Sequence, residues 1–468
     1  MWTFQGNGAR LCDGWTRREV LRAGGLGLLG SGLNLSALLR ATEAGPSLAI
    51  PPAAGFGRAK SCIVLFLLGG ATQHSTWDPK PDAPAEVRGP YGPIDTNVPG
   101  IRFAELMPQS AAIADKLCIL RAVSTGDNAH SSSGYYMMTG RPHAPKNVEN
   151  VPIGAPNDAP CLPAMARHLM TGSRGLPAGV TLPQAIFNTG GIPWPGQDAG
   201  FLGRSNDPWL LRGTPGPEGL QVDEVALPDD LDPSRIGRRR ALLDRLARTV
   251  ESPSIADGLD RHARQAFELL GSPEARRAFR TDLEPAETRD RYGRSPFGQS
   301  ALLARRLVEA GVRLVQVNWY RGADEPDANP CWDTHVDDPK RLKEVLVPPT
   351  DRALSALIRD LDGRGLLDET LVVCMSEFGR GPKIEGNGGR GHWGSVFSVA
   401  MAGGGVRGGQ VHGASDAFAA QPKDGKVTPE DLSATIFHAL GIPPETELRD
   451  RVNRPIPVSR GDVIPILG

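Results

Sequence analysis

The sequence predicts an α/β fold in which a mainly parallel sheet lies between layers of helices. Several short runs are continuously apolar, which is typical of strands buried on both faces of a sheet. In the second half of the chain these runs alternate with amphipathic segments, as in parallel strands joined by crossover helices. Polar and glycine-rich segments follow the runs, as they do at the ligand-binding edge of such sheets.

Five apolar runs are expected to form the central strands. They are short and rich in β-branched residues, which separates them from buried helices. The first precedes Gly69-Gly70, the fourth ends at Met375, and the fifth begins at Val396. The first four runs cover residues 61–68, 117–123, 313–319 and 371–375.

Three helices are expected in the second half of the chain. Residues 300–310 form an amphipathic segment, and Gly311 is a natural C-cap before the next strand. In residues 350–364 the apolar side chains fall on one helical face. The last helix is opened by Thr428-Pro429-Glu430-Asp431 and ends before Gly441.

The chain is expected to consist of an export segment and one large domain. Residues 1–59 read as signal and linker, and residues 60–468 read as the α/β domain. Within that domain, residues 151–298 are expected to be an insert. Its first part is irregular and rich in Gly and Pro, and residues 236–279 read as a charged, solvated pair of helices.

The N-terminus indicates export. Arg17-Arg18 is followed by an uncharged stretch, residues 23–39, that is rich in Gly, Leu and Ala, and this order resembles a twin-arginine signal. The stretch contains too many glycines for a stable membrane span. We therefore expect the twin-arginine export machinery as a partner and a periplasmic or extracellular location.

Composition excludes several other classes of protein. The formal net charge of the 468 residues is −1, so there is no basic surface of the kind that binds nucleic acid. The six cysteines form no CxxC pair, which argues against zinc fingers and thioredoxin-like sites. Cys62, Cys118 and Cys374 lie in or beside apolar runs, where buried free thiols are the usual outcome. No nucleotide-binding loop of the GxxxxGK[ST] or GxGxxG type is found after a strand.

Four polar clusters at or beyond predicted strand ends hold the residues that could do chemistry. Each contains one histidine, and two also contain a carboxylate of interest, Asp333 and Glu377. Imidazole and carboxylate groups bind metals or polarise esters. The alternatives are plain: a loop histidine is often solvated, and a strand-end glutamate can cap a helix. The four histidines are His74, His130, His335 and His392.

His130 and Ser131 begin a predicted helix. A helix N-terminus exposes N–H groups that favour an anion, so a hydroxyl or imidazole there could attack phosphorus or sulfur. Ser131 could equally serve as a helix cap. The basic residues beside these motifs, Arg141, Arg380 and Lys383, could hold the anionic group of a substrate or could pair with carboxylates.

Several motifs resemble those of a known superfamily. Counting back nine positions from the Thr139-Gly140 pair reaches His130, residues 376–379 read SEFG, and residues 428–441 read TPEDLSATIFHALG. This order of parts resembles the alkaline phosphatase and sulfatase superfamily. It is more closely similar to a family of uncharacterised bacterial proteins, exported by the twin-arginine route and often labelled sulfatase-like. That closer resemblance extends from residue 61 to the end of the chain.

The resemblance implies an alkaline phosphatase-like sheet, a nucleophile at position 130 and metal ligands at Asp333, His335 and His392. The sequence departs from the superfamily pattern at three points. Gly69-Gly70 stands where a metal-binding Asp is expected, a histidine fills the nucleophile position, and Phe378 replaces a metal-binding histidine. A complete two-metal site is therefore not expected. One divalent metal, zinc, manganese or iron, could be held by Asp333, His335, Glu377 and His392, with His74 as a further candidate.

Two functional hypotheses follow. The first is an exported hydrolase with a reduced metal site that acts on phosphate or sulfate esters, either small anionic molecules or polysaccharides. Its nucleophile would be His130, Ser131 or a water. The second is a non-catalytic exported binding or assembly protein on the same fold, because a fold does not guarantee activity.

Overall fold

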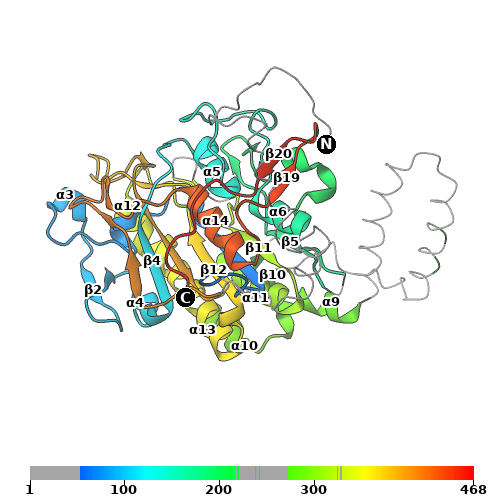
Figure 1. Cartoon of the computed structure of the whole chain (residues 1–468). Coiled ribbons are helices and arrows are strands. Elements are labelled where there is room, and N and C mark those ends of the chain that lie inside the picture. Colours follow the sequence, from blue (N-terminus) through cyan, green and yellow to red (C-terminus); the bar gives the residue numbers. More distant parts are fainter. Residues whose placement is uncertain are drawn as a thin grey trace, which may run out of the picture. The chain divides into compact units, whose positions relative to one another are not determined.

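One eight-stranded sheet forms the centre of the fold, with strand order β16-β4-β15-β12-β1-β11-β5-β8 (Figure 1). The computed structural model describes residues 53–173, 175–213, 215–216, 219–220, 238, 242, 272–323, 325–326 and 329–468. The sheet consists of β1 (Ser61–Phe66), β4 (Leu117–Val123), β5 (Gly179–Leu182), β8 (Trp209–Leu210), β11 (Leu314–Asn318), β12 (Thr370–Met375), β15 (Phe397–Ala402) and β16 (Gln410–His412).

The sheet is mixed but mostly parallel. β1 pairs in parallel with β11 and with β12, β5 pairs in parallel with β11 and with β8, and β16 pairs in parallel with β4. Only β15 runs the other way, antiparallel to its neighbours β12 and β4. The predicted α/β fold with a mainly parallel sheet is thus confirmed. One consequence matters for the site: β1, β4, β11 and β12 all end at the same edge.

Helices cover the sheet on both sides. The main ones are α5 (His130–Thr139), α6 (Leu162–Leu169), α10 (Ala286–Tyr292), α11 (Pro296–Ala310), α13 (Val347–Gly363) and α14 (Pro429–Ala439). α10, α11 and α13 pack against one another, and α5 packs against α14 on the other side of the sheet (Figure 1). Every residue of β1, β11 and β12 is buried, which explains why β1 and β12 are apolar almost throughout. In β11 the two buried polar side chains bond to each other, because Gln316 Nε2 donates to Asn318 Oδ1 at 2.8 Å.

Shorter elements decorate this core. The short helices are α3 (Ala85–Arg88), α4 (Pro108–Ala111), α9 (Pro273–Ala278) and α12 (Asp338–Arg341). Two-stranded ribbons are formed by β2 (Pro93–Asp95) with β3 (Arg102–Ala104), β6 (Phe187–Asn188) with β7 (Ile192–Pro193), β9 (Pro215–Gly216) with β10 (Gly219–Leu220), β13 (Gly379–Arg380) with β14 (His392–Trp393), β17 (Ala414–Ser415) with β18 (Pro422–Asp424), and β19 (Glu447–Arg449) with β20 (Pro455–Pro457).

Local signals in the sequence set the ends of the long helices. Ser295 caps α11 by accepting a hydrogen bond from the Gly298 N–H, and Gly311 ends that helix in the left-handed conformation, as predicted. Thr428 and Asp431 form a reciprocal capping box at the start of α14. These caps fix where each helix meets the sheet.

Residues 151–298 are only partly irregular. β5 and β8, from this stretch, extend the main sheet, and α6 packs against β5. Most of the predicted helix pair at 236–279 lies outside the described residues, as do the predicted export signal, Arg17, Arg18 and Cys12. Among described residues, the five cysteines are buried and unpaired, and no helix has the length and apolar character needed to cross a membrane.

Candidate metal centre

Segments that leave one edge of the sheet bring the candidate residues together. His130 begins α5 after β4, Asp333 lies in the loop after β11, and Glu377 follows β12 by two residues. His392 lies on β14, just before β15 starts at the same edge. Because parallel strands end together, residues separated by up to 262 positions in the sequence can share one site.

The His130 ring is held between two carboxylates. Its Nδ1 lies 2.7 Å from Glu377 Oε1, and its Nε2 lies 3.2 Å from Asp333 Oδ2. Two aromatic rings enclose the imidazole, since the ring centroids of Phe378 and Trp194 are 4.9 Å and 5.7 Å away. The ring is therefore fixed in orientation and largely shielded from water.

His392 and His335 approach the other oxygen of Asp333. His392 Nε2 is 3.0 Å and His335 Nε2 is 2.9 Å from Asp333 Oδ1, and the two Nε2 atoms are 2.9 Å apart. His392 Nδ1 lies 2.7 Å from the Asn128 carbonyl oxygen. Because a carbonyl only accepts, Nδ1 of His392 carries the proton, and in the neutral ring Nε2 presents a lone pair toward the carboxylate.

The arrangement fits a bound cation. A positive charge relieves the repulsion between the lone pairs of a carboxylate and a neutral imidazole at 3.0 Å, and Arg380, 2.7 Å from the same carboxylate oxygen, already supplies one. The ligand atoms of His130, Asp333 and His392 all lie within 4.8 Å of one another, so these three residues form a group that could hold a metal ion. Nitrogen and carboxylate oxygen ligands suit zinc, manganese or iron.

Burial and hydrogen bonding perturb the proton affinities of these groups. Burial alone lowers the pKa of His130, but the hydrogen bonds to Asp333 and Glu377 outweigh it and raise the pKa to about 10. Burial alone would raise the pKa of Asp333, yet the hydrogen bonds from His130 and His335, together with the charge of His130, hold it well below its usual range. Burial raises the pKa of Glu377 and lowers that of His392.

Glu377 is completely buried and is only partly satisfied. Its Oε1 accepts hydrogen bonds from the Gly69 N–H at 2.8 Å and from His130, whereas its Oε2 is a buried acceptor with no hydrogen-bond partner among the described residues. Gly69 has a φ of +113°, and a Cβ there would lie 2.3 Å from the Asp333 nitrogen. Glycine is therefore required at the position where the sequence lacks the expected aspartate.

Arg380 forms an ion pair with Asp333. Its guanidinium is fully buried and donates to Asp333 Oδ1 at 2.7 Å and to the Gly69 carbonyl at 3.2 Å. It does not line the cavity at the site. In this position it offsets the charge of Asp333, so of the two roles that the sequence left open it takes the pairing with a carboxylate.

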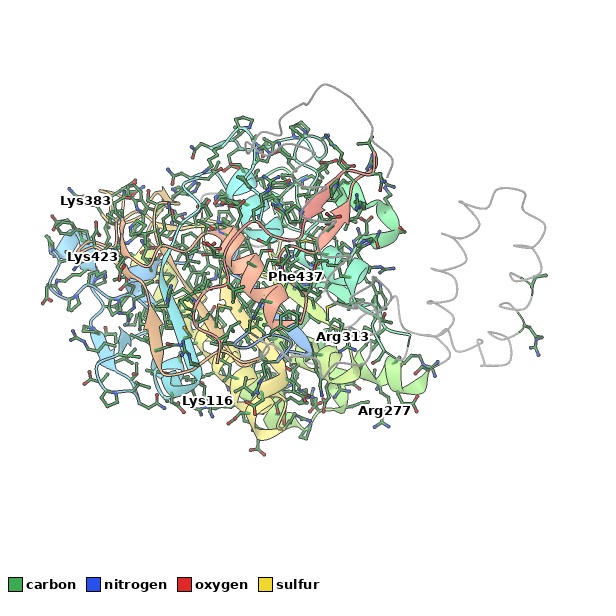
Figure 2. The ribbon with its side chains drawn as sticks, in the orientation of Figure 1. Lys116, Arg277, Arg313, Lys383, Lys423 and Phe437 are labelled. Carbon is green, nitrogen blue, oxygen red and sulfur yellow. The ribbon has the colours of Figure 1, made fainter. Side chains whose placement is uncertain are left out.

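The other sequence candidates lie apart from this group or face away from it. Ser131 is buried, and its hydroxyl donates to Glu149 Oε2 at 3.0 Å. Arg141 donates to the carbonyls of residues 457 and 458. Lys383 is exposed and lies at the periphery of the ribbon (Figure 2). His74 is buried elsewhere, with its Nε2 2.8 Å from the Phe418 carbonyl.

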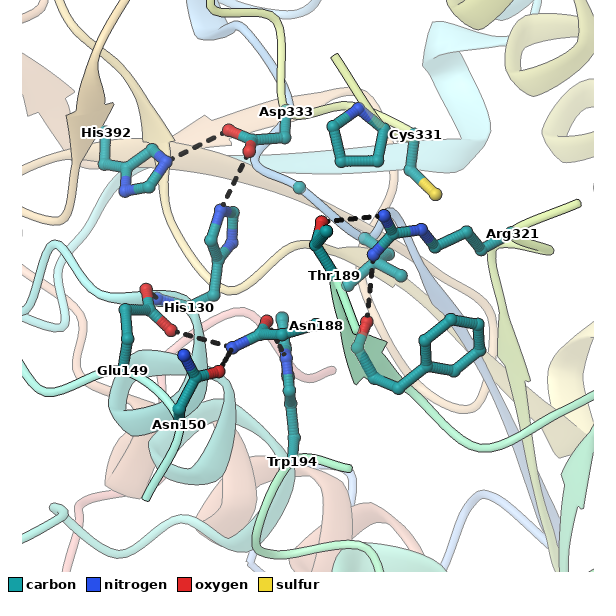
Figure 3. A pocket seen from close by; sticks show the side chains of 14 residues that line it. His130, Glu149, Asn150, Asn188, Thr189, Trp194, Arg321, Cys331, Asp333 and His392 are labelled. Atoms are coloured by element: carbon teal, nitrogen blue, oxygen red, sulfur yellow. Dashed lines mark hydrogen bonds and ion pairs between the residues drawn. The ribbon is translucent and has the colours of Figure 1, made fainter. Parts of the chain in front are cut away.

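A cavity of about 270 Å³ opens beside the three clustered residues (Figure 3). His130, Asp333 and His392 lie on one side of it in this view, and Arg321 lies on the other. Its wall also includes residues that the sequence reasoning did not select: Glu149, Asn150, Phe187, Asn188, Thr189, Trp194 and Arg321. Most of them come from the aperiodic stretch after residue 151, where no repeating pattern marks one residue over another.

Glu149 occupies the N-terminus of α5. Its carboxylate accepts hydrogen bonds from the backbone N–H groups of His130 and Ser131 and from Asn188. Burial raises the pKa of Glu149, but the nearby charge of His130 and these backbone N–H groups lower it below the usual value. The sequence suggested that a substrate anion could bind at the N-terminus of this helix. The Glu149 carboxylate occupies that position instead.

A family model that matches most of the sequence shows which family the chain belongs to. The family model described as "Protein of unknown function (DUF1501)" matches residues 59–467. The chain belongs to the DUF1501 family. This match confirms the resemblance to a family of uncharacterised proteins. Among curated proteins, none matches this DUF1501 protein.

Several solved structures match this DUF1501 protein at low sequence identity. Ps i-CgsB is 14% identical with a TM-score of 0.40, and the match covers 81% of this chain and 72% of that one. The PsFucS1 sulfatase from Pseudoalteromonas sp. is 14% identical with a TM-score of 0.39, covering 88% and 72%. A mutant of the TAB5 alkaline phosphatase is 13% identical with a TM-score of 0.34, covering 82% and 97%.

Proposed function

We propose that this DUF1501 protein is an exported hydrolase of phosphate or sulfate esters that works with one divalent metal ion. The observation that carries the proposal is the convergence of His130, His392 and His335 on the carboxylate of Asp333, at the wall of a cavity. The motif resemblance at Thr139-Gly140 and at residues 376–379 favours an ester as the substrate.

The metal would be held by Asp333 together with the Nε2 atoms of His130 and His392, and His335 offers a further nitrogen beside them. Glu377 then acts on His130 and not on the metal, because it accepts from Nδ1 and leaves Nε2 to the site. Histidine ligands commonly have the second ring nitrogen fixed in this way. A bound divalent ion would supply Lewis-acid polarisation of the ester.

The chain's own residues fix and enclose the groups of the metal centre. Phe378 and Trp194 enclose the His130 ring, and Arg380 compensates the charge of Asp333. Both nitrogens of His130 are engaged with carboxylates, and the hydroxyl of Ser131 is bonded to Glu149. This arrangement favours a water in the cavity as the attacking group over either side chain.

Metal content and turnover, measured together, test the proposal. The purified protein is expected to contain about one divalent metal per chain by elemental analysis and to hydrolyse 4-nitrophenyl phosphate or 4-nitrophenyl sulfate. His392→Ala and Asp333→Asn should lose both the metal and the turnover. His168→Ala is the matched control, because His168 is exposed on α6 and does not line the cavity.

The outcomes separate the two functional hypotheses. Metal without turnover of either ester supports a binding protein that has kept the site but lost the chemistry. A protein that holds no metal when it is purified or after incubation with Zn²⁺ or Mn²⁺ overturns the metal centre. Turnover that survives in both His392→Ala and Asp333→Asn shows that hydrolysis occurs elsewhere or comes from a contaminant.

A further inference from the structure

The cavity has a second wall with a positive charge. Arg321 lines it, three residues beyond the end of β11, and its guanidinium lies on the opposite side of the view from His130 and His392 (Figure 3). Among the described lining residues, Arg321 contributes the one guanidinium, and none of them is a lysine. The three basic residues suggested by the sequence do not line this cavity.

Neighbouring groups hold the Arg321 side chain in place. Its Nη2 donates to Thr189 Oγ1 at 2.9 Å and its Nη1 donates to the Phe187 carbonyl at 3.3 Å. The guanidinium carbon also lies 5.4 Å from the centroid of the Phe187 ring. Phe187 and Thr189 belong to the β6–β7 ribbon and its turn, so contacts with this ribbon fix the plane of the guanidinium. A fixed planar donor group is suited to a carboxylate or a sulfate.

The remaining wall mixes polar and apolar side chains, and the space is small. Asn150, Asn188 and Thr189 contribute amide and hydroxyl groups, and Trp194 contributes an aromatic surface. A volume of about 270 Å³ is at the low end for ligand cavities, which suits a ligand the size of a single ring with polar substituents.

We propose that the ligand of this cavity carries two anionic groups, one at the metal centre and one at Arg321. A sugar acid that bears a phosphate or sulfate ester has this chemistry, with its carboxylate bound by Arg321. The inference rests on the proposed function in one respect, namely that the ligand's phosphate or sulfate ester is the group that reacts at the metal centre. The binding of a second anion at Arg321 depends on the cavity alone.

A matched ligand pair tests the role of Arg321. Glucuronic acid 1-phosphate and glucose 1-phosphate differ in that a carboxylate replaces a hydroxymethyl group. Isothermal titration of the Zn²⁺-supplemented full chain should show tighter binding of the glucuronic acid ester, by about tenfold or more, as a charged hydrogen-bonded pair provides. Arg321→Gln should abolish that preference while leaving the affinity for glucose 1-phosphate within about twofold.

Arg313→Gln is the matched control. Arg313 stands at the other end of β11, donates to the carbonyls of residues 60 and 171, and does not line the cavity. It should keep the preference of the native protein. Circular dichroism of both variants shows whether either has lost its fold, and Arg321→Lys, which keeps the charge without the planar fork, should retain part of the preference.

The results distinguish the inference from the proposed function. Equal affinity of the native protein for both ligands, or an unchanged preference in Arg321→Gln, overturns the inference even if aryl esters are hydrolysed. A preference that depends on Arg321 without hydrolysis of any ester supports the two-anion cavity and rejects the hydrolase. Binding of neither ligand in the presence of Zn²⁺ overturns the inference.

Discussion

Asp333 is the residue on which the candidate metal centre depends. Each of its two carboxylate oxygens contacts at least one imidazole, and a buried arginine donates to it from behind. A carboxylate so deeply buried persists as an anion because these donors surround it. The residues around it have different tasks: His130 and His392 present nitrogens to the site, and Glu377 fixes the orientation of His130.

Replacing Glu377 by glutamine should weaken metal binding without removing a ligand. The amide keeps the size of the side chain but loses the negative charge that holds Nδ1–H of His130. We expect the Zn²⁺ affinity, measured by competition with a chromophoric chelator, to fall by about 10- to 100-fold. Glu369→Gln, just before β12, is the control, because Glu369 pairs with Lys60. Unchanged affinity in Glu377→Gln would show that this contact does not orient the ligand.

His74 should make the protein sensitive to acid. Burial, with a smaller effect from the charge of Arg390, lowers the pKa of His74 to about 3. In the unfolded chain His74 has a pKa near 6.5, so between about pH 6.5 and 3 it binds a proton there but not in the folded protein. The stabilisation that is present above about pH 6.5 is therefore lost as the pH falls toward 3. The contribution of this group to the free energy of unfolding should fall by about 1.4 kcal/mol per pH unit in that window.

The comparison of His74→Gln with the native protein isolates this effect. Glutamine can still donate to the Phe418 carbonyl but does not titrate. Urea unfolding at pH 7, 6 and 5 should show the largest advantage of the native protein at pH 7 and a smaller one at pH 5. A difference in unfolding free energy that is independent of pH would mean that His74 titrates normally in the folded state.

At the scale of elements, α5 connects β4 of the sheet to Trp194, which lines the cavity. It begins with His130, and Gly134, one turn later, lets the Trp194 ring pack directly on the helix backbone. Trp194 in turn stacks against His130 and donates to Asn188. The segment after residue 151 thus reaches the metal centre through a contact that no side chain larger than hydrogen at position 134 would allow.

Gly134→Ala should destabilise the protein although alanine favours helices. A Cβ at this position would lie 2.4 Å from two atoms of the Trp194 ring. We expect urea denaturation to show a loss of about 1–3 kcal/mol in the free energy of unfolding. Gly363→Ala, at the exposed end of α13 with nothing within 4 Å, should be neutral or stabilising by up to about 1 kcal/mol. Equal effects in both variants would contradict the packing argument.

At the scale of the whole molecule, one sheet edge gathers functional groups from segments far apart in the chain. Four of the strands that end there, β1, β4, β11 and β12, are buried on both faces by helices, so the edge is one of the places where polar side chains from several strands can meet. A preformed site of this kind is compatible with export in the folded state, in which a metal can be bound before the protein leaves the cytoplasm.

Export is expected to depend on the arginine pair near the N-terminus. In the full chain, the double substitution Arg17→Lys with Arg18→Lys should remove most of the protein from the periplasmic fraction of a bacterial host. Cell fractionation and immunoblotting measure this. The control, Arg10→Lys with Arg40→Lys, changes two other arginines of the same region and should leave export intact. Normal export of the Arg17, Arg18 variant would refute the twin-arginine route.

The sequence by itself determined five of the eight strands of the sheet, the helices α11, α13 and α14, and the caps of α11 and α14. The apolar runs at 61–68 and 117–123, the C-cap at Gly311 and the box at Thr428 are local signals, because burial and capping act over a few neighbouring residues. The same reasoning placed Asp333, Glu377 and four histidines at or just beyond strand ends.

Only the tertiary structure decided which of these polar residues meet and what each contacts. His74 contacts the Phe418 carbonyl, and Arg380 pairs with Asp333. Glu149 accepts hydrogen bonds at the N-terminus of α5, and Arg321 lines the cavity. The physical reason is that a hydrogen bond or ion pair depends on distance and direction in space. Residues 18 to 344 positions apart form these contacts, and nothing in their local sequence specifies the partner.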